Sequence, residues 1–184
     1  MAKLILGIAG EMGCGKGTIA KHVVAEYGGG SLRFSTILRD VLDRVHVEQS
    51  RENIQTLSTI LRKSYGEDIL ASAMMHDAEG APQDIVVVDG VRRMSDITHL
   101  KKLPHFHLVY VEADMEKRYE RIVQRGENSD DNSKTFEQFK RDHEDESELQ
   151  IRDLKNYADH VVDNNGTFME LYAQIDAIIN GNLS

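Results

Sequence analysis

Short apolar runs rich in β-branched residues alternate along this chain with longer segments in which apolar residues recur every three or four positions. The short runs are typical of strands and the longer segments of amphipathic helices. Residues 86–88 are three consecutive valines, and a strand that is apolar on both faces is typical of the centre of a parallel sheet. The alternation predicts an α/β fold in which helices cover a parallel sheet. We expect strands at 3–8, 31–35, 85–88, 107–112 and 159–163, and helices at 18–27, 36–46, 51–65, 68–77, 94–102, 115–125, 134–148 and 167–180.

Two of the predicted helices carry a start signal. Ser50 precedes the helix at 51–65 and can accept a hydrogen bond from a first-turn backbone N–H. Thr167 stands three residues before Glu170, which is the spacing of a capping box.

A glycine-rich segment joins the first predicted strand to the first predicted helix. It fits the pattern G-x-x-x-x-G-K, although the hydroxyl that usually follows the lysine comes one position later. Such a loop points several backbone N–H groups at one spot, and the lysine adds a mobile positive charge. The sequence therefore predicts a polyphosphate site built from Gly10, Gly13, Cys14, Gly15, Lys16, Gly17 and Thr18.

The third predicted strand ends at an acidic residue. Because ligands collect at the carboxyl ends of parallel strands, Asp89 can hold the hydration shell of Mg²⁺ together with Thr18. Gly90 allows a sharp change of direction, after which Arg92 can return over the sheet as an anion ligand. Arg93 is the competing candidate for that role.

The second predicted strand ends at Ser35, and Ser35 and Thr36 can cap the helix that follows. Arg39 lies one turn into this helix and can reach an anion held at its start. An arginine on an exposed helical face can also be merely solvated.

Three arginines follow one another at helical spacing in the segment 115–125. Arg118, Arg121 and Arg125 form one stripe beside an apolar stripe, so they share one side of the predicted helix. Such a stripe either pairs with acids at the surface or gathers around an anion.

The segment 126–148 is strongly polar and rich in acids. Its first half cannot bury a core, whereas Phe136 and Phe139 give its second half a helical pattern, so we expect a lid with one anchoring helix. Arg141 can reach into the site or form local ion pairs. After the fifth predicted strand, residues 163–166 form an Asx-type turn, which needs no ligand of its own.

The segment from Gly10 to Thr18 resembles the phosphate loop of nucleoside monophosphate kinases of the adenylate kinase type. Further matching segments follow in the same order, at 35–39, at 89–92 and at the arginine-rich helix ending at 125. The chain is also similar to small archaeal adenylate-kinase-like P-loop proteins, which share the Arg-Glu-Asn segment at 51–53. Its C-terminal turn at 163–166 looks like that of dephospho-CoA kinases.

This resemblance implies a P-loop NTPase fold with α/β/α layers, a five-stranded parallel sheet, an insertion at about 36–80 that binds the nucleoside monophosphate, and an inserted lid at about 126–148. It implies that ATP is the donor and that Lys16, Arg92, Arg121 and Arg125 act on the transferring phosphoryl group. The acceptor would be bound by Ser35, Arg39, Arg92, Asp96 and Arg141, and Asn165 and Gly166 would lie against the donor base with Arg121.

Transfer to a nucleoside or deoxynucleoside monophosphate is the predicted reaction. An anionic acceptor needs no general base, whereas the hydroxyl of dephospho-CoA benefits from one, and the end of the second strand carries no aspartate. Asp96 stands where adenylate kinases read AMP with glutamine, and a side chain that only accepts would suit guanine or cytosine. Two alternatives remain open, a dephospho-CoA kinase and an ATP-hydrolysing switch whose partner binds the acidic segment 126–148.

Composition narrows the class of protein. The 184 residues, 40% of them hydrophobic, suffice for one domain with one core, and no linker-like segment divides them. A net charge of −9 argues against nucleic acid as a partner. The single cysteine, Cys14, cannot form an internal disulfide, and it is either a redox-sensitive thiol or a small residue tolerated in the turn. With no signal peptide or membrane span in the pattern, we expect a cytoplasmic protein, and a monomer because no apolar helical stripe is left over.

Overall fold

The computed structural model describes residues 2–125, 135–143 and 146–183, and within these ranges it does not describe the side chains of residues 51, 125, 142 and 146–148. All strands belong to one five-stranded sheet in the order β2-β3-β1-β4-β5, and every neighbouring pair is parallel. The strands are β1 (Leu4–Ala9), β2 (Gly30–Arg33), β3 (Ile85–Val91), β4 (Phe106–Glu112) and β5 (His160–Asp163). The fold class expected from the sequence, a P-loop α/β fold with helices on both faces of a five-stranded parallel sheet, is confirmed.

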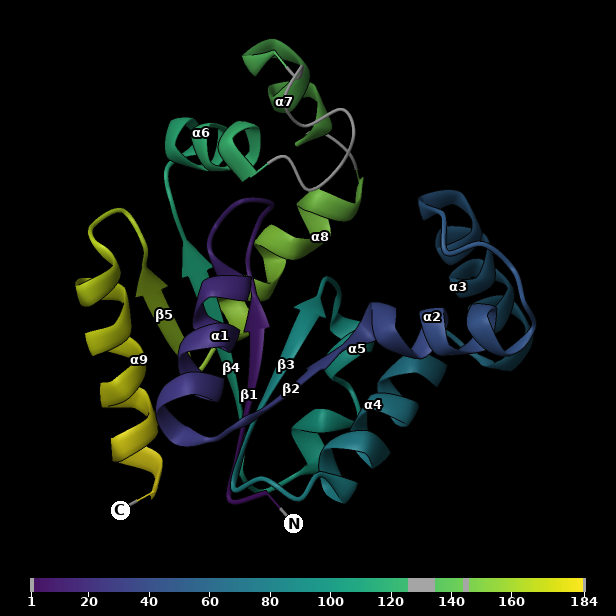
Figure 1. Cartoon of the computed structure of the whole chain (residues 1–184), viewed down its shortest axis with the longest axis horizontal. Coiled ribbons are helices and arrows are strands. Elements are labelled where there is room, and N and C mark those ends of the chain that lie inside the picture. The colour runs from purple at the N-terminus through teal and green to yellow at the C-terminus, as the bar shows by residue number, and fades with distance from the viewer. Residues whose placement is uncertain (1, 126–134, 144–145, 184) are drawn as a thin grey trace.

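Helices connect the strands and cover the sheet on both faces (Figure 1). They are α1 (Lys16–Tyr27), α2 (Phe34–Arg44), α3 (Arg51–Tyr65), α4 (Ile69–Gly80), α5 (Met94–Ile97), α6 (Met115–Arg125), α7 (Phe136–Asp142), α8 (Glu146–Asp153) and α9 (Phe168–Leu183). Short 3-10 turns follow at Leu100–Lys102 and Leu154–Tyr157. Within the described residues, no helix has both the length and the apolar character needed to cross a membrane.

The protein has one hydrophobic core on each face of the sheet, and the side chains of β1 alternate between the two. Leu4, Leu6 and Ile8 pack with α1 and α9 on one face of the sheet. Ile5 and Ala9 point to the other face, where α2, α4 and α5 cover the sheet. This period of two is the physical reason that one strand can serve both faces of a central parallel sheet.

The carboxyl ends of all strands lie at the same edge of the sheet, as in any parallel arrangement. Figure 1 shows the loop between β1 and α1 at this edge, with α6 and α7 beyond it on one side and α2 and α3 projecting on the other. The expected monophosphate-binding insertion and the described part of the expected lid therefore lie on either side of the glycine-rich loop. The lid segment 126–148 is described only at 135–143 and, for its backbone, at 146–148.

Both predicted helix starts are confirmed. The Asn53 N–H donates to the Ser50 hydroxyl at 3.2 Å, and the Glu170 N–H donates to the Thr167 hydroxyl at 3.3 Å. The Glu170 carboxylate accepts from the Thr167 N–H in return, at 2.7 Å. Hydrogen bonds from the backbone and hydroxyl of Thr167 lower the pKa of Glu170, because they favour its charged form.

Several predicted boundaries are wrong, and three of them change how the site is assembled. Strand β2 ends at Arg33, because the buried Phe34 already begins α2, so Ser35 and Thr36 lie inside the helix and do not cap it. The helix expected at 94–102 consists of α5 followed by a 3-10 turn. The helix expected at 134–148 is two helices, since α7 ends where His143 turns inward, and α8 extends to 153 so that Ile151 reaches the core.

Candidate nucleotide-binding site

The loop between β1 and α1 has the backbone geometry of an anion cradle. Gly10, Gly13 and Gly15 have φ angles of 144°, 78° and 109°, a region that side chains rarely adopt. Gly15 is the N-cap of α1, and no side chain caps this helix. The first N–H groups of a helix have no intrahelical acceptor, and here they face the loop at the positive end of the helix dipole. The loop is therefore ready to receive an anion.

Each of these glycines also lies against another part of the chain. A Cβ atom would lie 2.5 Å from the Val111 carbonyl oxygen at Gly10, and 2.7 Å from the Arg118 carbonyl oxygen at Gly13. At Gly15 it would lie 2.2 Å from the side-chain nitrogen of Asn164. Only glycine fits at these positions, for reasons of both space and conformation.

Lys16 folds back over the loop that precedes it. Its Nζ donates to the carbonyl oxygens of Gly10 at 2.6 Å and of Glu11 at 3.1 Å, and lies 3.7 Å from Cys14 Sγ. A phosphate oxygen can replace these neutral acceptors and form a stronger, charge-assisted bond. Cys14 itself is buried among the apolar residues between α1 and the sheet, which makes it part of the core on that face.

Asp89 lies next to β1 at the same edge. It pairs with Ile8 in the register of the sheet, one residue before β1 ends, and its carboxylate is nearly buried. Arg33, at the end of β2, donates from Nε to Asp89 Oδ2 at 3.0 Å. Gly90, with φ 91°, does not end β3 in a turn but forms a bulge, because Ala9 pairs with Val91.

Arg92 and Arg93 leave β3 in different directions. The Arg92 side chain is exposed and has no partner among the described residues, whereas Arg93 lies 3.9 Å from the Glu67 carboxylate. Of the two, Arg92 is the guanidinium group that is free to bind an anion.

Asp96, expected to read the acceptor base, is instead buried and fully occupied. Its Oδ1 accepts from Arg62 Nη2 at 2.8 Å, and its Oδ2 accepts from the backbone N–H groups of Arg92 and Arg93 at 3.0 and 3.2 Å. Binding a base would break a buried ion pair, so we do not retain Asp96 as a substrate ligand. Its role in this geometry is to hold α3 against the loop that carries Arg92.

Replacing Arg62 with methionine should therefore lower the free energy of unfolding by about 3–5 kcal/mol, because the buried Asp96 carboxylate would lose its counter-charge. Urea denaturation measures this change. Arg93→Met is the matched control, since its ion pair with Glu67 is largely exposed and should contribute about 0–1 kcal/mol. Equal losses in the two variants would contradict the argument.

The remaining acceptor candidates lie on α2. Arg39 is exposed and donates to Gln49 Oε1 at 2.9 Å, in the connection to α3. Ser35 is half-buried in the first turn of α2, after the end of β2. Arg39 thus lies on α2 with a neutral acceptor, the Gln49 amide oxygen, that an anion can replace.

The three arginines expected to act from the lid side differ in their surroundings. Arg121 donates from Nη2 to the Asn164 carbonyl oxygen at 2.8 Å, while its Nη1 is buried and has no hydrogen-bond partner among the described residues. Arg141 is exposed on α7. Arg125 ends α6, and its side chain lies outside the described residues.

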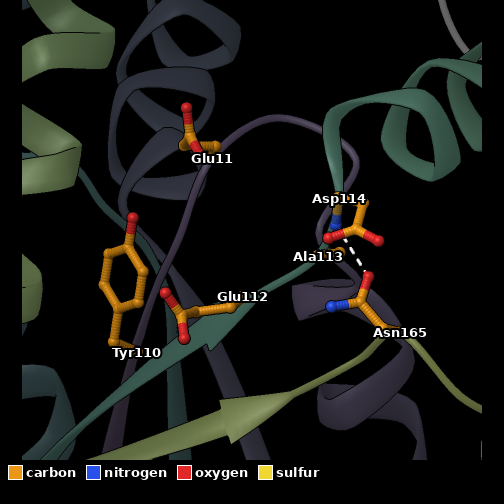
Figure 2. Close-up of a pocket in the computed structure, with 6 residues that line it drawn as sticks. All are labelled: Glu11, Tyr110, Glu112, Ala113, Asp114 and Asn165. Atoms are coloured by element: carbon orange, nitrogen blue, oxygen red, sulfur yellow. Dashed lines mark hydrogen bonds between the residues drawn. The ribbon is translucent and has the colours of Figure 1, made fainter.

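The turn after β5 lines a small open pocket of about 200 Å³ (Figure 2). Asn165 accepts from the Asp114 N–H at 2.8 Å, and Gly166 is packed so closely that a Cβ atom would lie 2.1 Å from the Glu170 carboxylate. The pocket is lined by Glu11, Tyr110, Glu112, Ala113, Asp114 and Asn165. Its carboxylates repel phosphate, so this pocket is unsuited to the phosphates of a nucleotide.

Tyr110, on the pocket wall, stays a hydrogen-bond donor at any ordinary pH. Burial raises the pKa of its phenol well above the usual value, and the nearby carboxylates of Glu11 and Glu112 act in the same direction.

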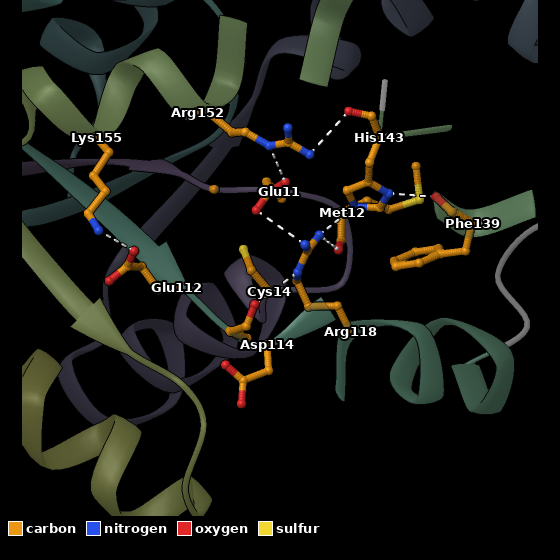
Figure 3. A network of polar contacts seen from close by, with 12 residues as sticks. Glu11, Met12, Cys14, Glu112, Asp114, Arg118, Phe139, His143, Arg152 and Lys155 are labelled. Carbon is orange, nitrogen blue, oxygen red and sulfur yellow. Dashed lines mark hydrogen bonds and ion pairs between the residues drawn. The ribbon is translucent and has the colours of Figure 1, made fainter. Parts of the chain in front are cut away.

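Sequence reasoning missed the side chains that hold the loop from outside. Arg118 is the most deeply buried arginine among the described side chains, at 3% exposed, and contacts Glu11, Met12 and His143 (Figure 3). Asn164 is also buried and donates to the Cys14 carbonyl oxygen. Nothing in the local spacing separates Arg118 from the neighbouring arginines of its helix, so no signal in the sequence could have found it.

The sheet order, the glycine-rich loop and its lysine define a P-loop nucleotide-binding protein with the architecture of P-loop kinases, which supports nucleotide-dependent phosphoryl transfer in general. Residues 9–140 match the family described as AAA domain (AAA_17). A UPF0200 protein of Hyperthermus butylicus is 30% identical over 138 residues, covering 75% of this chain and 73% of the relative. The chain belongs to the AAA_17 domain family and, within P-loop proteins, to the UPF0200 family.

Other relatives agree with this assignment. A UPF0200 protein of Saccharolobus islandicus is 29% identical over 179 residues, which cover 96% of this chain and 92% of the relative. Among solved structures, TT1252 from Thermus thermophilus has a TM-score of 0.65 at 14% identity and covers 98% of both chains. Shikimate kinase from Acinetobacter baumannii in complex with shikimate has a TM-score of 0.54 at 15% identity, covering 98% of this chain and 96% of that one. At such low identity, these two structures show the fold alone.

Proposed function

We propose that this protein transfers the terminal phosphoryl group of ATP to a nucleoside or deoxynucleoside monophosphate. The observation that carries the proposal is the meeting of two features at one edge of the sheet. An uncapped helix start with Lys16 offers positive potential for the donor phosphates. Arg33 is the last residue of β2, and Arg39 and Arg92 lie in the segments that follow β2 and its neighbour β3. Aligning two polyanions is the main task of such an enzyme.

The donor phosphates would occupy the cradle at 10–18. Their oxygens would accept from the backbone N–H groups at the start of α1, and Lys16 would exchange the Gly10 and Glu11 carbonyl oxygens for the phosphates.

The residues near the cradle fit Mg²⁺ held through water. Thr18 and Asp89 supply a hydroxyl and a carboxylate oxygen, which are hard donors of the kind that Mg²⁺ prefers, and Asp89 Oδ2 is already oriented by Arg33. Within the described residues, no group of three or more histidine, cysteine, aspartate or glutamate side chains is arranged to hold a metal ion. When bound, Mg²⁺ neutralises charge on the transferring phosphoryl group.

The chemistry at the end of β2 favours an anionic acceptor. A hydroxyl acceptor benefits from a carboxylate base at the end of β2, but the chain has Arg33 there. The neighbouring carboxylate of Asp89 forms an ion pair with the Arg33 guanidinium group. Arg92, without a partner among the described residues, and Arg39 would bind the acceptor phosphate, with Ser35 nearby at the start of α2. This arrangement argues against the dephospho-CoA kinase alternative.

Arg121 would approach the nucleotide from the lid side. Its buried Nη1 lacks an acceptor among the described residues, and leaving a buried donor unpaired costs about 1–3 kcal/mol, which a ligand oxygen would recover. Arg125 and Arg141 remain proposed partners of the phosphoryl group and the acceptor. Asn165 and Gly166 remain proposed neighbours of the donor base.

Purified protein with ATP and Mg²⁺ should form ADP rapidly with one or a few acceptors from a panel of nucleoside and deoxynucleoside monophosphates, assayed beside dephospho-CoA and a reaction without acceptor. Acceptor-dependent ADP formation that disappears in Lys16→Met supports the proposal. Slow turnover independent of any acceptor would instead support an ATP-hydrolysing switch, and activity with dephospho-CoA alone would support that kinase.

We further propose that the protein acts as a monomer in the cytoplasm on free nucleotides, without nucleic-acid or membrane partners. Its net charge of −9 disfavours nucleic acid. Sedimentation with and without ATP measures the oligomeric state.

A further inference from the structure

Two carbonyl groups of the glycine-rich loop are held from outside the loop. The Met12 carbonyl oxygen accepts from Arg118 Nη1 at 3.2 Å, and the Cys14 carbonyl oxygen accepts from the Asn164 side-chain amide at 2.7 Å. The donors come from α6 and from the turn after β5, so two segments that are distant in the sequence each fix one peptide group. Figure 3 shows the contact between Arg118 and Met12.

The geometry of a trans peptide gives these contacts a consequence on the inner side of the loop. The carbonyl of one residue and the N–H of the next point in opposite directions, and the described residues contain no cis peptide bond. Fixing the Met12 carbonyl towards Arg118 therefore points the Gly13 N–H away from α6. Fixing the Cys14 carbonyl towards Asn164 likewise points the Gly15 N–H away from the β5 turn.

We propose that Arg118 and Asn164 are positioning residues that aim the N–H groups of Gly13 and Gly15 at a bound phosphate. The inference rests on the anion-binding part of the proposed function and is independent of the acceptor. The ligand class is a di- or triphosphate, which needs several converging N–H donors.

Lys16 explains why these peptides need to be held. Its ammonium group attracts carbonyl oxygens, and those of Gly10 and Glu11 already face it. Glycine permits either orientation of an adjoining peptide group, because it adopts both signs of φ at little cost. Without their outer partners, the Met12 and Cys14 carbonyls could also turn inward and present negative dipoles to the anion.

Arg118 is itself held on several sides. Its Nε donates to the Ala113 carbonyl oxygen at 3.0 Å, and its Nη2 lies 3.2 Å from the Glu11 carboxylate. Its Nη1 also contacts His143 Nε2. The Phe139 carbonyl can only accept, so His143 carries its proton on Nδ1 and offers a lone pair at Nε2 to the guanidinium group. The side chain that fixes Met12 is thus anchored to the connection between β4 and α6, to the C-cap of α7 and to the glycine-rich loop.

Asn164 is also held in place, through hydrogen bonds of its backbone. Its own N–H donates to the Glu112 carbonyl oxygen at 2.8 Å, and its carbonyl oxygen accepts from Arg121. The absent Cβ of Gly15 leaves room for the Asn164 amide beside the loop. The Asn164 side chain must present its NH₂ to Cys14, because a carbonyl cannot donate.

Asn164→Leu keeps the branched shape of the side chain and removes the donor, and Arg118→Met removes the guanidinium group. We expect each variant to bind inorganic pyrophosphate at least about ten-fold more weakly by titration calorimetry, as for the loss of one well-aligned, charge-assisted donor. In nitrogen-15 NMR spectra, pyrophosphate should shift the Gly13 and Gly15 amide signals in the wild type much more than in the corresponding variant.

The matched control is Asn182→Leu, because this amide also donates to a backbone carbonyl, that of Ile178, but near the end of α9. It should bind pyrophosphate as the wild type does. Folded Asn164→Leu protein with wild-type pyrophosphate affinity and wild-type amide shifts would overturn the inference, and this variant decides it if Arg118→Met does not fold. A protein that binds pyrophosphate in this way but phosphorylates no monophosphate would refute the proposed reaction alone.

Discussion

Replacing Lys16 with methionine should reduce the rate of ADP formation from ATP and the preferred acceptor by about 10³-fold, because removing one charged donor from a phosphoryl-transfer site costs on the order of 10²–10³ in kcat. The ammonium group is the mobile charge of the cradle, and its present partners are two neutral carbonyl oxygens of the loop. Methionine keeps the unbranched shape and most of the length of the side chain, so the fold should persist. Steady-state kinetics at saturating ATP measure the effect.

Lys21→Met is the matched control, since Lys21 is exposed on the same helix. It should leave kcat within about two-fold of the wild type, as expected of a surface charge. If both lysine variants retained full activity, the reaction would have to take place away from the cradle.

Replacing Gly15 with alanine should both destabilise the protein and abolish detectable ATP binding. A left-handed conformation costs an alanine about 1–2 kcal/mol, and Gly15 has φ 109°. The new methyl group would also lie 2.2 Å from the Asn164 amide and displace it from the Cys14 carbonyl, which adds about 1–3 kcal/mol for unpaired buried groups. Urea unfolding and titration with ATP measure the two losses.

Gly17→Ala is the control that tests whether any added side chain in the loop destabilises the protein. Gly17 has no atom within 4 Å of a Cβ position and no positive φ. Its free energy of unfolding should stay within about 1 kcal/mol of the wild type, since alanine favours a helix start at least as well as glycine. A Gly15→Ala protein that bound ATP normally would show that the start of α1 is not the phosphate site.

Much of the fold could be predicted because its signals are local. Consecutive valines at 86–88 can only be buried by a strand covered on both faces, and Ser50 and Thr167 cap helices whose first turns begin at the next residue. The errors lie where burial competes with a local signal. Phe34 starts α2 early because its ring enters the core, and His143 ends α7 because its imidazole binds Arg118.

The candidate site also has one part that could be predicted from local signals and one part that could not. The cradle could be predicted because its residues are contiguous, and β1 delivers them to the carboxyl edge of the sheet. Asp96 was misinterpreted because its partner, Arg62, lies 34 residues away, on α3. Spacing alone could not show that its carboxylate is buried and occupied.

Local residue patterns were enough to specify the alternation of strands and helices, the glycine-rich loop and the helix starts, since each depends on residues within a few positions of one another. The side chains that hold that loop could be identified only from the folded chain. Asn164 reaches Cys14 across 150 positions of sequence, and Arg118 reaches Met12 across 106. The strand order places β4 beside β1 and β5 beside β4, so α6, which follows β4, and the turn after β5 can both reach the loop that follows β1. A hydrogen bond depends on distance in space, which periodicity along the chain does not encode.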